Sequence, residues 1–245
     1  MLLAIDIGNT SIHVGLFAGR RLRRQVSVPT ALARSPRKLG RKLKLRAEEA
    51  IICSVVPKVT PIVVAALKKA GVRRVRIVGK DVRVPLKNRY RYPGQVGQDR
   101  LVGAYAAWKE FGQDCIVCDF GTAVTIDVVS QKGEYLGGII APGLELSLET
   151  LAARTALLPE VDLQQPAELL GRDTVNSIRS GLVNGTAAMC DGVVAKLKRK
   201  YARHAVVVAT GGAAPLIARH ATSIRYLRPN LVLDGLFLLV VRNRA

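Results

Sequence analysis

Two turns in the sequence combine an acidic residue, a glycine and a hydroxyl-bearing side chain. Asp6-Ile7-Gly8-Asn9-Thr10 follows the apolar run of residues 1–5, and Asp119-Phe120-Gly121-Thr122 follows the apolar run of residues 115–118. Glycine lets the backbone approach a ligand closely, amides and hydroxyls donate hydrogen bonds, and an aspartate organises a cation. Either turn alone is equally typical of an ordinary hairpin. Because the pattern occurs twice, we predict two loops that bind the phosphates of one nucleotide.

Two further motifs could complete such a site. Thr210-Gly211-Gly212 follows an apolar run, and its bare backbone suits either a base or ribose or simply the turn into a helix. Gly97-Gln98-Asp99-Arg100 precedes the amphipathic stretch 101–111, so Asp99 could be no more than a helix-capping residue. Alternatively, Asp99 accepts the proton of a substrate hydroxyl that attacks the γ-phosphate, as an aspartate does in other kinases. Arg100 could then pair with a substrate carboxylate.

The elements that must position these motifs alternate between strands and helices, which favours an α/β fold. Strands are predicted at 2–6, 12–17, 23–28, 50–56, 75–79, 115–118, 123–130, 135–140 and 205–209. Helices are predicted at 31–46 in two pieces around Pro36, and at 59–70, 101–111, 144–156, 175–201 and 231–241. The two acidic turns are 113 residues apart (119 minus 6), close to half the chain, as a duplication would give.

Composition excludes several classes of protein. The 245 residues are 49% hydrophobic and 23% charged, which suits a folded chain of one large domain or two lobes. The apolar run 231–241 is too short to span a membrane, and Asp6 interrupts the first apolar stretch, so we expect a cytoplasmic protein. Walker A, G-x-G-x-x-G and H-E-x-x-H patterns do not occur. The four cysteines fit buried apolar positions better than a metal or redox site.

The formal net charge of +20 invites a nucleic-acid hypothesis. The basic residues lie on ordinary amphipathic segments with little aromatic interleaving, so a solvated basic surface is the preferred interpretation. Such a surface would still attract anionic substrates such as ATP. We therefore expect nonspecific polyanion binding in vitro, and treat a nucleic-acid partner as unlikely.

Together the motifs Asp6-Ile7-Gly8-Asn9-Thr10, Gly97-Gln98-Asp99-Arg100, Asp119-Phe120-Gly121-Thr122 and Thr210-Gly211-Gly212 resemble the type III pantothenate kinases. These belong to the acetate and sugar kinase, Hsp70 and actin superfamily. The stretches 137–143 and 174–181 are also similar, and the resemblance runs from Met1 to about Gly235. It implies a two-lobed actin-like (ribonuclease H-like) duplicated α/β fold, with mixed sheets flanked by helices. The implied lobes are residues 1–113, with the first phosphate loop, and 114–245, with the second loop and the adenosine motif.

The resemblance also implies ATP-dependent phosphorylation of pantothenate to 4'-phosphopantothenate, the first step of coenzyme A synthesis, with Mg²⁺ and a potassium or ammonium ion. It implies Asp99 as the proton acceptor and Asp119 as the ligand of the monovalent cation. The ATP-binding residues that it implies are Asp6, Ile7, Gly8, Asn9, Thr10, Ser11, Ile12, His13, Thr122, Gly211 and Gly212. The pantothenate contacts that it implies are Tyr90, Gly97, Gln98, Asp99, Arg100 and Thr174. Thr174 is expected to reach the pocket from the second subunit of a homodimer.

Two other functions stay open at this stage. Some relatives are described as accessory transcription regulators, so the alternative is a non-catalytic regulator that binds nucleic acid through its basic surface. A related kinase of a carbohydrate or small acid would use the same nucleotide site. However, each acidic position that the chemistry requires is present in this chain.

Overall fold

A computed structural model describes residues 1–34 and 47–242. By contacts the chain divides into two compact units. The first comprises Met1–Leu86, Arg91–Ala106 and Leu231–Ala245, and the second comprises Lys87–Tyr90 and Ala107–Asn230. The helix α3 (Gln98–Phe111) begins in the first unit and ends in the second.

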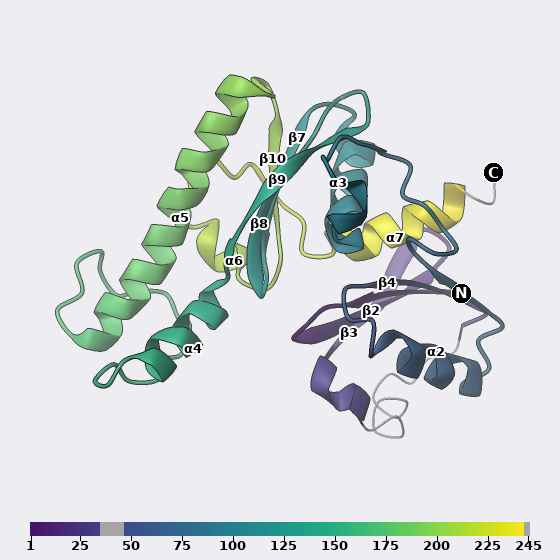
Figure 1. The fold of residues 1–245 in the computed structure, drawn as a ribbon, viewed down its shortest axis with the longest axis horizontal. Helices are drawn as coiled ribbons and strands as arrows, with labels where there is room; N and C mark the ends of the chain where they lie inside the picture. Colours follow the sequence, from purple (N-terminus) through teal and green to yellow (C-terminus); the bar gives the residue numbers. More distant parts are fainter. Residues whose placement is uncertain (35–46, 243–245) are drawn as a thin grey trace. The chain divides into compact units, whose positions relative to one another are not determined.

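The first unit is built on a five-stranded sheet in the order β3-β2-β1-β4-β5 (Figure 1). Its strands are β1 (Leu2–Ile7), β2 (Ser11–Ala18), β3 (Arg21–Pro29), β4 (Glu49–Ser54) and β5 (Arg74–Ile77). The first three strands are antiparallel, and β4 and β5 run parallel to β1. The apolar runs of β1 and β4 are buried on both faces, which is why these strands lie at the centre.

Helices cover both faces of this sheet. The helix α2 (Thr60–Lys69) packs Val63 and Leu67 against Leu3, Ile5 and their neighbours. The helix α7 (Leu231–Arg242) packs on the opposite face, where the rings of Phe17 and Phe237 stack with centroids 4.7 Å apart. Two short 3-10 helices complete the unit, η1 (Thr30–Arg34) and η2 (Pro93–Gln95).

The second unit repeats this topology. Its strands are β6 (Lys87–Asn88), β7 (Cys115–Phe120), β8 (Ala123–Val129), β9 (Glu134–Pro142), β10 (Val206–Thr210) and β11 (Tyr226–Leu227). They form one sheet in the order β11-β10-β7-β8-β9-β6. The strands β9-β8-β7-β10-β11 match β3-β2-β1-β4-β5 in order and in relative direction. This match confirms the predicted duplicated, actin-like fold with mixed sheets.

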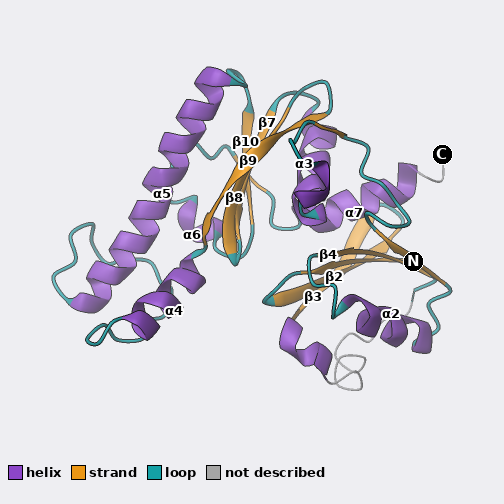
Figure 2. Ribbon diagram, viewed as in Figure 1, coloured by secondary structure: helices purple, strands orange, loops and turns teal. Residues whose placement is uncertain are grey.

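The helices of the second unit are α4 (Leu144–Arg154), α5 (Thr174–Lys200) and α6 (Ala214–Ile217) (Figure 2). The long helix α5 buries Val183, Ala187 and Val194 against alternate residues of β7 and β8. Its N-terminus is capped by Asp173, whose carboxylate accepts a hydrogen bond of 2.8 Å from the amide of Asn176. This capping bond is the main reason that the pKa of Asp173 is lowered.

Most predicted elements are present, with ends shifted by a few residues. The helix predicted over 31–46 is an exception, because the described part of it is only the 3-10 helix η1. The rest of that prediction, residues 35–46, lies outside the described residues. The short strands β6 and β11 and the helix α6 were not predicted.

Candidate functional site

The first acidic turn is held in place by hydrogen bonds to its backbone. The amide of Gly8 donates to the carbonyl of Ser11 over 2.9 Å. The buried Thr30 donates its hydroxyl to the carbonyl of Gly8 over 2.7 Å and its amide to the carbonyl of Thr10 over 2.8 Å. The side chains of Asn9 and Thr10 remain exposed. The turn therefore presents polar side chains to solvent on a fixed backbone.

The residues that flank this turn divide between the core and the surface. Ile7 and Ile12 are fully buried in the core, so only their backbone groups could meet a nucleotide. Asp6 and Ser11 are half-buried. His13 is also half-buried and lies directly opposite Asp6 in the β1–β2 pair. Burial lowers the pKa of the His13 imidazole from its ordinary value of 6.5, which favours its neutral form.

The charges of Asp6 and Asp99 both affect the buried thiol of Cys53. Burial strongly raises the pKa of the Cys53 thiol, and the negative charges of Asp6 and Asp99 raise it further. Cys53 is the β4 partner of Asp6 in the parallel β1–β4 pair. Two of the three predicted acidic residues therefore lie close to one point of the first unit.

The predicted substrate motif forms the first turn of α3. The carboxylate of Asp99 accepts a hydrogen bond of 2.8 Å from the amide of Arg100. A side chain on Gly97 would clash with that carboxylate, because its Cβ would lie only 2.4 Å from Oδ1 of Asp99. Gln98 packs over Gly79, which follows β5. Gly97 is thus required sterically for the observed position of the Asp99 carboxylate.

The second acidic turn lies beside the Thr210-Gly211-Gly212 motif. Asp119 and Thr210 are register partners at the ends of the parallel strands β7 and β10. Gly211 has a φ of 93°, and a Cβ there would lie 2.4 Å from Oδ1 of Asp119. Only glycine fits both requirements. The structure therefore brings two motifs together that are far apart in sequence.

Thr122 and Gly212 border the same region of the second unit. The side chain of Thr122 is exposed, and its carbonyl accepts a hydrogen bond of 3.0 Å from the amide of Gly143, which caps α4. Gly212 has no atom within 4 Å of the position where a Cβ would be. One polar region of the second unit is therefore formed by the turn 119–122, the start of α4 and the end of β10. Its backbone is accessible at Gly212.

Tyr90 is positioned by the edge strand β6. Its amide donates to the side-chain oxygen of Asn88 over 2.9 Å, and the amide of Arg89 donates to the carbonyl of Tyr135 over 2.8 Å. The rings of Tyr90 and Tyr135 have centroids 6.4 Å apart and are tilted by 44°. Tyr135 is fully buried and Tyr90 is half-buried, so the Tyr90 ring rests on a core side chain and keeps part of its surface exposed.

Thr174 lines a hollow at the start of α5 with a volume of ≈ 570 Å³. Its lining contains no other predicted site residue. The residues that line it are Leu151, Leu158, Gly171, Arg172, Asp173, Thr174, Ser177 and Ile178.

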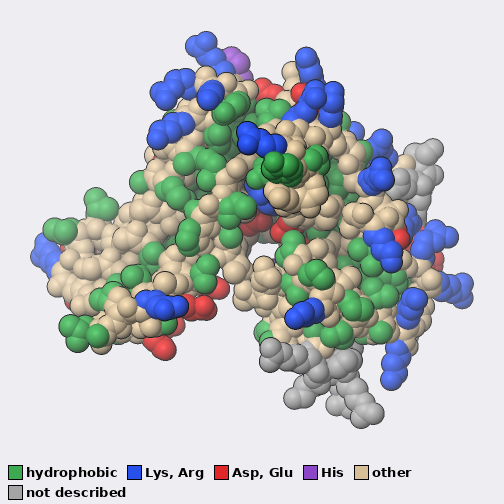
Figure 3. All heavy atoms as spheres, viewed as in Figure 1, with side chains coloured by type: hydrophobic (Ala, Val, Ile, Leu, Met, Phe, Trp, Pro, Cys, Tyr) green, Lys and Arg blue, Asp and Glu red, His purple; other side chains and the backbone are tan. Residues whose placement is uncertain are grey.

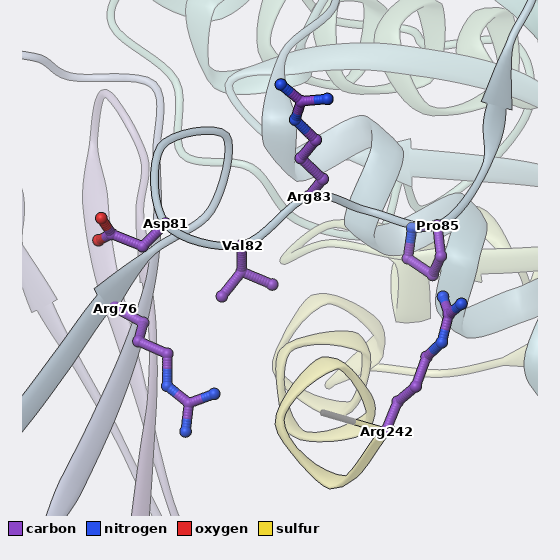
Figure 4. Close-up of a pocket in the computed structure, with 6 residues that line it drawn as sticks. All are labelled: Arg76, Asp81, Val82, Arg83, Pro85 and Arg242. Carbon is purple, nitrogen blue, oxygen red and sulfur yellow. The ribbon is translucent and has the colours of Figure 1, made fainter. Parts of the chain in front are cut away.

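A basic hollow of ≈ 470 Å³ in the first unit contains none of the predicted residues (Figure 4). It is lined by Arg76, Asp81, Val82, Arg83, Pro85 and Arg242. The guanidinium groups of Arg76, Arg83 and Arg242 point in different directions in Figure 4, and Arg76 is paired with Glu49 at 3.2 Å. Because phosphate clamps need converging donors, we assign it no phosphate site.

Basic side chains occupy many separate places on the surface. On the face drawn in Figure 3, Lys and Arg form several groups rather than one continuous patch. This distribution agrees with a solvated basic surface. No helix among the described residues is long and apolar enough to cross a membrane.

The described residues contain no cluster of three or more metal-ligating side chains. A Mg²⁺ ion that travels with a nucleotide needs no such cage, because phosphates and waters supply most ligands beside one or two carboxylates. The half-buried carboxylate of Asp6 beside the first turn fits that requirement. All four cysteines are buried, and burial raises the pKa of Cys115 to about 12, so the cysteines fit apolar packing positions.

A sequence model of the type III pantothenate kinases matches residues 2–196 of the chain. The chain belongs to the type III pantothenate kinase family. A type III pantothenate kinase of Anaeromyxobacter sp. (strain K) is 39% identical over 254 residues, which cover all of both chains. Kinases of this family use ATP with a divalent metal ion and act on pantothenate.

Solved structures agree with the fold. A candidate 2-dehydro-3-deoxygalactonokinase from Sinorhizobium meliloti is similar with a TM-score of 0.62 at 17% identity, and covers 99% of each chain. A candidate Baf family transcriptional activator from Campylobacter jejuni is similar with a TM-score of 0.64 at 17% identity, and covers 99% of this chain and 98% of its own. At such identities both similarities show the shared fold alone.

Sequence reasoning missed Thr30, which holds the first turn, and Asp127, a buried acidic residue on β8. Thr30 gave no signal, since it is 22 residues from Gly8 and its role depends on folding. Asp127 did give one, because it is an acidic residue within the alternating strand 124–128.

Proposed function

We propose that the chain transfers the γ-phosphoryl group of ATP to the primary hydroxyl of pantothenate, which yields 4'-phosphopantothenate for coenzyme A synthesis. The observation that carries this proposal is the family match over residues 2–196, in which every acidic residue of the motifs is present. A cytoplasmic location is part of the same proposal.

In this proposal the two acidic turns bind the same nucleotide. Gly8, Asn9 and Thr10 donate hydrogen bonds to the phosphates from the fixed first turn, and Thr122 donates from the second. Asp6 holds Mg²⁺ through its carboxylate, and Asp119 holds a potassium or ammonium ion. When bound, these cations would neutralise charge that develops on the transferred phosphoryl group. Gly211 and Gly212 leave room for the adenosine.

The acceptor is bound and deprotonated by the start of α3. Asp99 accepts the proton of the pantothenate hydroxyl as the hydroxyl oxygen attacks the γ-phosphorus and ADP leaves. Arg100 pairs with the pantothenate carboxylate, because a guanidinium suits bidentate contact with a carboxylate. Tyr90, Gly97 and Gln98 contact the remainder of the substrate. Positioning supplies most of the rate gain.

We also propose a homodimer in which Thr174 completes the partner's pantothenate pocket. Large apolar side chains are exposed in the segment that precedes Thr174, and an apolar surface of this kind is typical of an interface. They include Leu157 at 92% exposure and Leu169 and Leu170 at 76% each.

Mixing two inactive variants tests the shared pocket. If Thr174 acts across the interface, subunits with Asp99→Asn and subunits with Thr174→Ala should regain activity when they are unfolded and refolded together. The intact Asp99 and the intact Thr174 then meet in one of the two pockets. Each variant refolded alone is the control. Recovery no greater than the sum of the controls would contradict the shared pocket.

A coupled ADP-release assay tests the reaction itself. ADP should appear only when pantothenate is present, and its rate should rise when potassium replaces sodium. ADP release that ignores pantothenate would contradict the proposal, and release with sugars or small acids instead would favour the related kinase. Asp119→Asn should weaken the potassium dependence, and a wild-type potassium response of that variant would remove Asp119 from its role.

A further inference from the structure

Asp127 is the one acidic residue that is buried among the residues that the structure describes, with 2% of its surface exposed. It lies on β8, in the middle of the second sheet. An ionised carboxylate in such a place is costly unless hydrogen bonds compensate for the lost water. Its position in the core therefore requires a reason.

Both carboxylate oxygens of Asp127 accept a hydrogen bond. The hydroxyl of Tyr135, whose side chain is fully buried, donates to Oδ1 over 2.6 Å. The hydroxyl of Thr125 donates to Oδ2 over 3.2 Å. Hydrogen bonds to a charged acceptor are stronger than neutral ones, so the carboxylate fixes the orientation of both donors.

One of these donors lies beside the second acidic turn. Thr125 is the direct register partner of Asp119 across β7 and β8. Side chains of directly opposite residues lie on the same face of a sheet and contact each other. Asp127 follows two residues later on that face. The pKa of the Cys118 thiol on β7 is raised chiefly by its hydrogen bond with Cys190 and by burial, and the charges of Asp127 and Asp119 raise it further.

The other donor lies beside Tyr90. Tyr135 pairs with Asn88 in the parallel β6–β9 ladder, and its carbonyl accepts from the amide of Arg89. Its ring is the neighbour of the Tyr90 ring at 6.4 Å. The position of Tyr135 therefore determines the surface on which Tyr90 rests.

We propose that Asp127 is a positioning residue that orients Thr125 against the cation ligand Asp119 and Tyr135 against the substrate contact Tyr90. The inference rests on the proposed function, because it takes the roles of Asp119 and Tyr90 from it. Asp127 touches neither ATP nor pantothenate. It holds both binding surfaces through one buried carboxylate.

Two substitutions test the two hydrogen bonds of Asp127 separately. Thr125→Val should raise the potassium concentration for half-maximal activity about 10-fold or more, the usual range for groups behind a metal ligand, with a smaller effect on the KM for pantothenate. Thr125→Ser keeps the hydroxyl and should restore the potassium response. Tyr135→Phe should show the reverse split, with a raised KM for pantothenate and a near-normal potassium response. Asp127→Asn should show both defects.

Exposed residues of the same types provide matched controls. Thr150→Val on α4 and Tyr226→Phe on β11 also remove one hydroxyl each and should leave both constants unchanged. If Asp127→Asn fails to fold, the two hydroxyl variants still decide the question. Loss of thermal stability in these variants, with both kinetic constants within about twofold of wild type, would overturn the inference and leave a merely structural network.

Failure of the proposed function is recognised separately. A wild-type protein without pantothenate-dependent ADP release would refute that function before any variant is compared. The effect of the Thr125 hydroxyl on potassium binding is then measured without turnover. The readout is the increase in Tm when potassium replaces sodium. Thr125→Val should lose this increase and Thr125→Ser should keep it. An equal increase in wild type and Thr125→Val would overturn the inference.

Discussion

The position of the Asp99 carboxylate depends on the residue two places before it. Gly97 leaves the space that Oδ1 of Asp99 occupies, and the amide of Arg100 donates to that oxygen. A proton acceptor must be held within hydrogen-bond reach of the hydroxyl it serves. The motif Gly97-Gln98-Asp99-Arg100 is therefore a geometric unit and not only a set of chemical groups.

Asp99→Asn should reduce turnover by about two orders of magnitude or more while ATP binding stays nearly unchanged, since general base catalysis typically contributes that share. Turnover is measured by ADP release and ATP binding by calorimetry. Glu160→Gln, an exposed carboxylate outside the motifs, is the control. Unchanged turnover of Asp99→Asn would show that another group accepts the proton.

His13 should make folding stability sensitive to mild acid. Because burial lowers its folded pKa below the ordinary 6.5, the unfolded chain binds a proton first as the pH falls. Stability from this group is present above about pH 6.5 and is lost as the pH falls through the folded pKa. Chemical denaturation between about pH 7 and pH 5.5 should show a shallower loss for His13→Asn than for wild type. The exposed His204→Asn should keep the wild-type slope, and equal slopes in all three would contradict the assignment.

At the scale of elements, α3 and α7 approach each other closely at Gly235. A Cβ there would lie 2.6 Å from the carbonyl oxygen of Val102 and 3.2 Å from the Cβ of Ala106. Gly235→Ala should therefore reduce the free energy of unfolding by about 1–3 kcal/mol through overpacking.

Gly192→Ala on α5 is the matched control for that prediction. It has no atom within 4 Å of its Cβ position, so the alanine should be neutral or should stabilise the helix by about 0.5–1 kcal/mol. Both values are read from urea denaturation. Equal effects of the two substitutions would show that α7 does not pack as described.

Local patterns explain which elements the sequence could predict. Alternating apolar residues and glycine turns identified β2 and β8 to within two residues, because that information lies within each hairpin. The strands β6 and β11 have two residues each and no period of their own. They exist only through pairing with β9 and β10, which a local pattern cannot reveal.

The same distinction applies to the site. The motifs predict Asp6, Asp99 and Asp119 as the acidic site residues, since each motif is contiguous. The contact of Gly211 with Asp119 and the bond from Thr30 to Gly8 depend on strand register across distant segments. Which groups could act is therefore a prediction from the sequence, and only the fold shows what holds those groups in place.

At the scale of the whole molecule, a net charge of +20 should produce weak and salt-sensitive binding of polyanions. Because such binding depends on counterion release, affinity for a random DNA duplex should fall steeply between about 50 and 200 mM salt. Fluorescence anisotropy with two unrelated duplexes measures this, and both should behave alike. Tight, salt-resistant binding that selects one sequence would instead support the regulator.

The return of α7 to the first sheet has a consequence for synthesis on the ribosome. The face that contains Phe17 is covered by residues 231–242, which are translated only after the whole of the second unit. The amino-terminal strands therefore keep an apolar surface uncovered until residues 231–242 have emerged from the ribosome. A fragment of residues 1–113 should aggregate when expressed alone and become more soluble when a peptide of residues 231–242 is supplied in trans.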